Sequence, residues 1–316
     1  MKFLKTYPIQ AAGLALGIMS ISEFWRFFIP NHNAAHSTTT IIGIIGLALL
    51  LPAMIKLICH PQELAAALRN PTISCILPTI SMSLMLMSKA FNGLGTAFSS
   101  TLWLAAILLH AIFLILFIVY RTKDFTMSSI QASWFIPPVG MAVACLTTPT
   151  EALLAVSQGV AIFTMVAYIL VSPFILWTLI NNTSKKNHSD NSNAILAAPA
   201  SLVLSGYLST FKQPQPLIII LLYATCIIKI ITVYKLLTQL LRLPFQLSCS
   251  CLTFPLAISA IASLKVSQWM LGISVLAPYS NLVLLIGTIE GIIASCIILC
   301  VFIGYMKHFI RTNLDQ

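Results

Sequence analysis

Charged residues are scarce in this sequence. Only 8% of its 316 residues are Asp, Glu, Lys or Arg, and only 7 of those are acidic. A soluble domain carries roughly 25% charged residues, so this few cannot cover a surface that faces water. Hydrophobic residues make up 59% of the chain, and the mean hydropathy is +0.97. The composition therefore predicts a chain whose main solvent is lipid, with no separate soluble domain.

The same scarcity excludes several function classes. The 6 His and 7 acidic residues form no metal-binding or catalytic motif. Cys249 and Cys251 form a C-x-C pair without a second pair or a nearby histidine, which argues against zinc. No Gly-rich phosphate loop with Lys is present, which argues against an ATP-driven pump. We expect no enzyme, metal or cofactor. We also expect no nucleic-acid partner, because the basic residues behind the net charge of +10 lie between apolar segments.

Ten apolar segments have about the 20 residues that a helix needs to cross a bilayer. The alternation of polar and apolar residues typical of a β-barrel is absent. The predicted fold class is therefore an all-α integral membrane protein, with residues 1–316 as one transmembrane domain. The expected spans are 6–28, 39–58, 72–92, 98–120, 128–147, 152–180, 194–211, 215–236, 247–270 and 281–307.

Basic residues are distributed unequally between the two sets of connections. Twelve fall on one side and four on the other, while Lys229 lies within a span. The positive-inside rule predicts that the richer side and both termini are cytoplasmic, in the cell (inner) membrane. The twelve are Lys2, Lys5, Lys56, Arg69, Arg121, Lys123, Lys185, Lys186, Lys235, Arg242, Lys307 and Arg311, and the four are Arg26, Lys89, Lys212 and Lys265.

A proline recurs in every odd-numbered span, in similar surroundings. These prolines are Pro8, Pro78, Pro138, Pro199 and Pro255, separated by 70, 60, 61 and 56 residues. A period near 60 residues indicates a repeated helical hairpin, and proline kinks a helix and frees a carbonyl. We therefore predict five hairpins, with kinked odd helices lining a central pore and even helices facing lipid. The alternative is that the small residues near these prolines only permit close helix packing.

The same segments resemble the tellurite-resistance/dicarboxylate transporter family, which includes bacterial TehA and the plant guard-cell slow anion channel. The resemblance rests on Tyr7-Pro8-Ile9 with Gly13 and Gly17, on 134–140 (WFIPPVG), on 198–201 (APAS) and on 253–256 (TFPL). It implies ten helices in five quasi-symmetric hairpins and a homotrimer with one pore per subunit. It also implies that a phenylalanine of the ninth helix plugs the pore, a position that Phe254 matches best. Gln10 and Ala12 depart from the family pattern in the first helix.

Lys89, Lys212 and Lys265, with Arg26, lie toward the outer ends of odd spans. If these helices line a pore, the cations form an outer vestibule that concentrates anions. The alternative is that they reach toward lipid headgroups.

Deeper charges are costly in a membrane and are usually paired or functional. We expect Lys229 and Glu290 to form a mutual salt bridge or a pairing at a subunit interface, with proton coupling at Glu290 as the alternative. We expect His110 to be hydrogen-bonded to a neighbouring helix.

Together these features predict a channel or exporter for small inorganic or organic anions, gated by a phenylalanine. The alternative is a proton-coupled carrier of C4-dicarboxylates, sulfite or tellurite.

Overall fold

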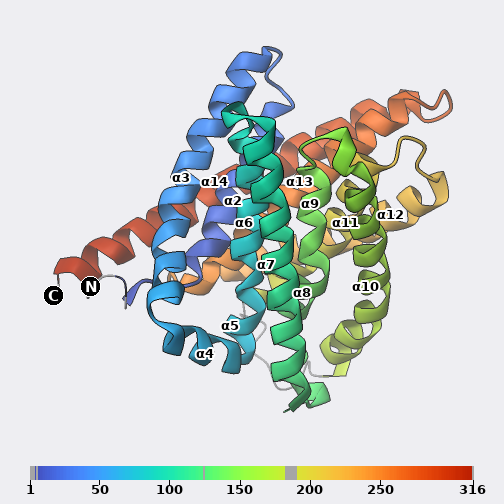
Figure 1. Cartoon of the computed structure of the whole chain (residues 1–316). Helices are drawn as coiled ribbons and strands as arrows, with labels where there is room; N and C mark the ends of the chain where they lie inside the picture. Colours follow the sequence, from blue (N-terminus) through green and yellow to red (C-terminus); the bar gives the residue numbers. More distant parts are fainter. Residues whose placement is uncertain (1–3, 5, 124, 182–190, 315–316) are drawn as a thin grey trace.

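The computed structural model describes residues 4, 6–123, 125–181 and 191–314, and Figure 1 shows them coloured along the chain. These residues form helices and turns without a β-strand, which confirms the all-helical class. In chain order the α-helices are α2 (Ala11–Arg26), α3 (His32–Cys59), α4 (Pro61–Arg69), α5 (Pro71–Ile76), α6 (Pro78–Ala90), α7 (Thr96–Lys123), α8 (Ile136–Val139), α9 (Val143–Leu146), α10 (Leu154–Asn181), α11 (Ala198–Thr210), α12 (Pro216–Leu240), α13 (Thr253–Leu271) and α14 (Ser280–Leu314). The short 3-10 helices are η1 (Asn92–Leu94), η2 (Met127–Ser129), η3 (Ala132–Phe135), η4 (Gly140–Ala142), η5 (Glu151–Leu153), η6 (Asn191–Ala197), η7 (Leu247–Leu252) and η8 (Ala277–Tyr279).

Within the described residues, seven helical segments are long and apolar enough to cross a membrane, so the chain is an integral membrane protein. The seven are His32–Cys59, Pro71–Ala90, Thr96–Lys123, Glu151–Thr178, Pro216–Leu240, Leu247–Leu271 and Ala277–Arg311. The other three expected spans, 6–28, 128–147 and 194–211, fall on shorter or interrupted helices. For example, α2 has 16 residues and α11 has 13. At about 1.5 Å per residue, such helices do not reach across the bilayer core by themselves.

The shortness of these helices has a cause in the proline repeat. In most odd segments a short 3-10 or α-helical piece comes first, and a second helix begins at or next to the proline. Pro78 and Pro199 stand in the first turns of α6 and α11, after α5 and η6. Pro255 is the third residue of α13, after η7. Proline suits a first turn because its missing N–H would have no partner there. The repeat therefore marks the positions at which these segments depart from a single regular α-helix.

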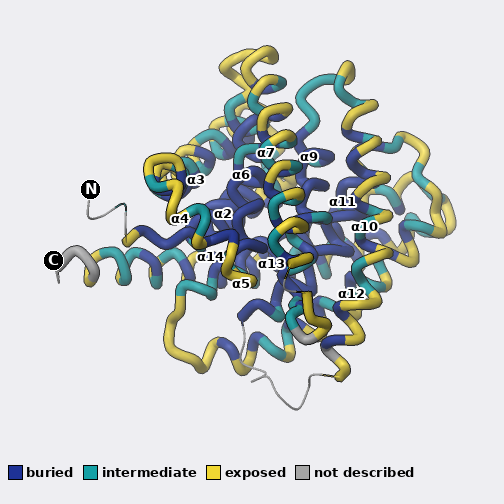
Figure 2. Tube along the Cα trace, turned by 60° about the horizontal axis from the view of Figure 1, so that its bottom comes forward, coloured by how far each residue is buried: buried dark blue, intermediate teal, exposed yellow. Residues whose placement is uncertain are grey.

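Burial separates the helices into an inner and an outer layer. Almost all of α2 is buried, from Ala11 to Ser22 without a break and again at Phe24. Helix α7 instead buries one stripe at three- and four-residue spacing: Ser99, Trp103, Ala106, His110, Phe113, Phe117 and Arg121. Large apolar side chains such as Leu108 and Ile115 are exposed on its other face. Figure 2 shows the pattern for the whole molecule, with buried segments inside and exposed turns outside. Helix α7 thus packs one stripe against the protein core and presents apolar side chains on its other face, as expected of a helix that lies between the core and lipid.

Small residues let the inner helices approach closely. A Cβ atom on Gly17 of α2 would overlap the side chain of Thr253, the first residue of α13. Since glycine stands there, the Thr253 hydroxyl shares its one proton between the carbonyl oxygens of Gly13, at 3.1 Å, and Ser250, at 2.7 Å. The start of α13 is thus fixed against the middle of α2. Close packing through glycine and hydroxyl groups is typical of membrane helices.

His110 confirms the expectation of a hydrogen bond to a neighbouring helix. It lies fully buried on α7, with Nδ1 3.0 Å from the Ser81 hydroxyl of α6 and Nε2 2.9 Å from the Pro137 carbonyl of α8. The Ser81 hydroxyl also lies 2.7 Å from the carbonyl oxygen of Pro78, the first residue of α6. His110 therefore connects two of the interrupted segments.

Candidate functional site: two cavities divided by Phe254

An apolar cavity lies among the five odd segments, each of which contributes to its wall. We call it the apolar cavity, and its volume is about 50 Å³. It is lined by Gly13, Leu16, Ile76, Thr79, Met82, Phe135, Ile136, Val139, Gly140, Ile195, Ala198, Pro199, Leu202, Ser250, Cys251, Phe254 and Pro255. These residues come from α2, from α5 and α6, from η3 to η4, from η6 and α11, and from η7 and α13. None of the lining side chains carries a formal charge.

Two of the five repeated prolines, Pro199 and Pro255, line the apolar cavity. Pro8, Pro78 and Pro138 are not among its lining residues, although each lies in or beside a segment that contributes to the wall. The geometry therefore assigns these three prolines to the helix interruptions rather than to the cavity surface.

A second, larger cavity is lined by four charged residues, all of them partly buried. We call it the charged cavity, and its volume is about 260 Å³. Its walls come from α2, α6, α9 and α13. It is lined by Ser20, Glu23, Arg26, Phe27, Leu86, Lys89, Val143, Leu146, Phe254, Ile258, Ile261, Leu264, Lys265 and Gln268.

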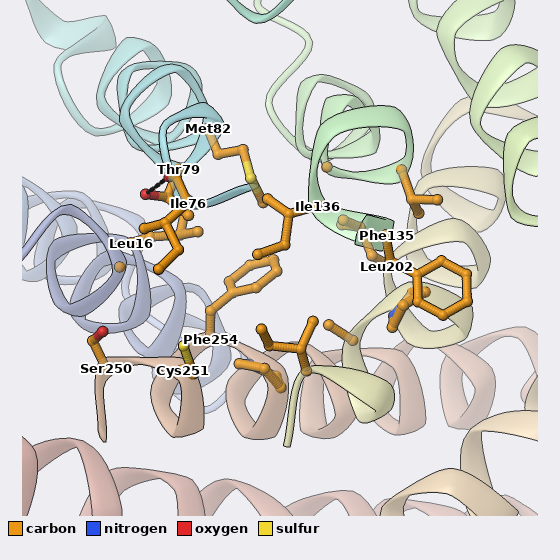
Figure 3. A pocket seen from close by; sticks show the side chains of 17 residues that line it. Leu16, Ile76, Thr79, Met82, Phe135, Ile136, Leu202, Ser250, Cys251 and Phe254 are labelled. Carbon is orange, nitrogen blue, oxygen red and sulfur yellow. Dashed lines mark hydrogen bonds between the residues drawn. The ribbon is translucent and has the colours of Figure 1, made fainter. Parts of the chain in front are cut away.

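Among the residues that the structure describes, only Phe254 lines both cavities. Its side chain is 8% exposed, and Figure 3 shows the ring projecting from α13 across the apolar cavity toward Ile136. Its backbone follows Thr253, which is hydrogen-bonded to α2, and precedes Pro255. The ring is therefore held between the two cavities by residues fixed on either side of it.

The charged cavity holds three cations and one anion. The Lys89 ammonium lies 2.5 Å from Oε2 of Glu23 and also donates to the Leu146 carbonyl, at 3.3 Å. The Arg26 guanidinium lies 4.0 Å from the other oxygen of Glu23. Lys265 forms no ion pair or side-chain hydrogen bond with the described part of the chain, although its charge interacts with those of Lys89 and Glu23. The cavity therefore carries an excess of positive charge, which attracts anions in low-dielectric surroundings.

The structure brings Lys89 and Lys265 together but places Lys212 elsewhere. Lys212 follows α11 and lies 3.9 Å from Glu151, with side-chain exposures of 83% and 93%. This pair lines an open surface hollow near Thr148 and Phe211 rather than the charged cavity. An exposed pair of this kind contributes little stability. The sequence already showed Arg26 as a fourth cation near the outer ends of the odd spans. Its pairing with Glu23 could have been predicted from the spacing of three residues on one helix.

Lys229 and Glu290 do not pair with each other, contrary to the expectation from their depth. Lys229 donates to the Tyr168 hydroxyl at 2.9 Å and stands over the rings of Tyr168 and Phe135, 4.7 and 5.1 Å from their centres. Glu290 accepts hydrogen bonds from Ser259, at 3.1 Å, and Ser263, at 3.3 Å. The two residues lie on different helices, and each faces its own set of partners. Glu290 is only 4% exposed, which also argues against a pairing at a subunit interface.

The structure is therefore that of a helical membrane protein with an apolar cavity beside a charged one. The sequence profile of the SLAC1 family, described as voltage-dependent anion channel, matches residues 6–306. The chain therefore belongs to this family, whose class is that of anion channels and transporters. Direct comparison with curated proteins gives no match.

We predict that neutralising Lys89 or Lys265 with Gln slows anion flux into proteoliposomes most at low salt. At an ionic strength of about 10 mM the expected loss is roughly two- to fivefold, and it should shrink near 1 M, where charges are screened within about 3 Å. Lys212→Gln is the matched control, because its ammonium lies outside the cavity. Equal flux at low salt in all three variants would indicate lysines that only reach toward headgroups.

Proposed function

We propose that the protein is a channel for small anions and that Phe254 is its gate. Anions gather in the charged cavity, pass the Phe254 ring and continue through the apolar cavity. The observation that carries the proposal is that Phe254 alone lines both cavities. An aromatic ring in a narrow neutral passage excludes water and ions, so it closes the path until it moves.

The proposal includes an orientation and an assembly. The chain forms one domain over residues 1–316, with ten spans in five hairpins and both termini in the cytoplasm of the cell (inner) membrane. The charged cavity then faces outward, and Lys89, Lys265 and Arg26 form its vestibule. Three subunits assemble, each with its own path. What supports this topology is the inner layer of interrupted segments and the excess of basic residues on one side. The transported anion is small, and chloride and nitrate are the natural probes.

Phe254→Ala should raise the anion current of the protein in planar bilayers, because the ring that fills the passage is removed. Phe254→Leu should raise it less, since it leaves a smaller gap. Protein yield and oligomeric state should stay near those of the unaltered chain. If Phe254 only packed the interior, Ala would instead cost about 3–5 kcal/mol of stability and lower the yield.

Phe24→Ala is the matched control for this experiment. Phe24 is a fully buried Phe on α2 that lines neither cavity and contacts Gly291 of α14. Its removal should lower the yield without raising the current. A normal yield of Phe254→Ala with no gain in current would refute the gate.

A proton-coupled carrier of C4-dicarboxylates, sulfite or tellurite is the second candidate function, and Glu290 is the observation that favours it. Its carboxylate is buried on α14, while the ion pairs of the described residues involve Glu23, Glu63 and Glu151 instead. Its two serine partners lie on α13, the helix that carries Phe254. Tyr223 extends the chain of hydroxyl groups to Ser263, at 3.4 Å. An acidic group without a cation inside a membrane is a natural proton site.

The two functions differ in their response to a pH gradient at fixed voltage. A channel should carry anion flux into liposomes that is set by the anion gradient and voltage alone. A carrier should be driven by the pH gradient, and Glu290→Gln should abolish that drive while Ser259→Ala weakens it. If flux through the unaltered protein follows the pH gradient, the protein is a carrier and not a passive channel.

A further inference from the structure

The charged cavity contains an anion of the protein's own. Glu23 projects from α2 into the space between Lys89 of α6 and Arg26, one turn further along its own helix. Its side chain is 15% exposed and that of Lys89 27%, so both groups keep contact with the cavity. The carboxylate therefore occupies the position that a dissolved anion would take beside the Lys89 ammonium.

The remaining cation of the cavity faces this pair from another helix. Lys265 lies on α13, eleven residues after Phe254 in the chain, and interacts electrostatically with both Lys89 and Glu23. The cavity has three cations and one carboxylate, so its net charge stays positive after Glu23 is paired and still attracts anions. Lys265 has no carboxylate partner among the described residues, so an entering anion can bind it directly. At Lys89 the anion must compete with Glu23.

A tethered competitor has a physical advantage over a dissolved anion. Because it is attached to the wall, its effective concentration at Lys89 is high and does not depend on the bath. A channel needs sites that bind ions well enough to let them enter but loosely enough to let them leave. A carboxylate that returns to Lys89 as each anion departs would keep occupancy short.

We propose that Glu23 is a tethered competitor for permeating anions and thereby sets the anion affinity and turnover of the charged cavity. This inference rests on the proposed function, since it names the residue that limits binding along the same path. The ligand class is a small inorganic anion, such as chloride or nitrate, held between Lys89 and Lys265.

The direct test is Glu23→Gln in the Phe254→Ala background, so that current does not depend on gate opening. Current is measured against chloride concentration in planar bilayers, with gluconate replacing chloride at constant ionic strength. The half-saturating chloride concentration should fall by about three- to tenfold, the scale of one partly buried ion pair. The maximal current should stay equal or fall, because bound anions leave more slowly. An unchanged or higher half-saturating concentration at normal protein yield would overturn the proposal.

Two controls separate competition from a structural effect. Glu151→Gln removes the carboxylate of the exposed pair with Lys212, outside the cavity, and should leave the half-saturating concentration unchanged. Lys89→Gln should raise that concentration, and adding it to Glu23→Gln should erase the gain, because the freed ammonium is then absent. A gain that survives the loss of Lys89 would contradict the assignment.

A second readout does not require conduction. Anions that bind the folded protein stabilise it against heat, so nitrate should raise the melting temperature of purified Glu23→Gln at lower concentrations than that of the unaltered chain. Equal nitrate dependence would overturn the competitor role. If the nitrate shift is present but Phe254→Ala passes no current, the anion site stands and the channel proposal fails.

Discussion

The contact between the start of α13 and the middle of α2 positions the rest of the site. Gly17 offers no side chain, so Thr253 comes close enough for its hydroxyl to reach the Gly13 carbonyl. Phe254 is the next residue, and its direction follows from this anchor. The Thr253 hydroxyl thereby links the start of α13 directly to the backbone of α2. The ring that separates the two cavities is thus held by backbone geometry as well as by packing.

The interrupted helices explain how an apolar protein builds a polar entrance. These segments meet around the apolar cavity, where small residues such as Gly13 and Gly140 stand among bulky apolar ones. The outer helices then supply the apolar surface that meets lipid. Four charged side chains of α2, α6 and α13 gather in the charged cavity. The division between a neutral centre and a cationic entrance suits an anion path that attracts ions before a hydrophobic barrier.

Much of the fold could be predicted from the sequence because lipid imposes simple rules. Apolar runs indicated membrane helices, and the proline period indicated where the inner segments are interrupted. Pairings between distant side chains could not be predicted in the same way. Depth alone suggested that Lys229 and Glu290 would meet, yet the rotation of their helices gives them Tyr168 and Ser259 as partners.

The candidate site was predictable to a similar extent. Lys89, Lys212 and Lys265 share a position near the ends of odd spans, but spacing along the chain does not show which cavity a side chain enters. Lys212 follows the end of a short helix and is almost fully exposed, whereas Lys265 belongs to the buried helix α13. Position along a span therefore predicts depth, while the neighbours at that depth depend on tertiary packing.

In the proposed mechanism, Phe254 closes a continuous path between the charged and apolar cavities. Cys251, one turn before Phe254, lines the apolar cavity and serves as a reporter on the far side of the ring. The measurement is the rate at which a small, negatively charged thiol reagent, added from the side of the charged cavity, modifies Cys251 in a variant whose other cysteines are Ser. We expect Cys251 to be protected from the reagent when residue 254 is Phe and to be modified rapidly in Phe254→Ala. Equal modification rates in the two proteins would contradict a closed path through Phe254.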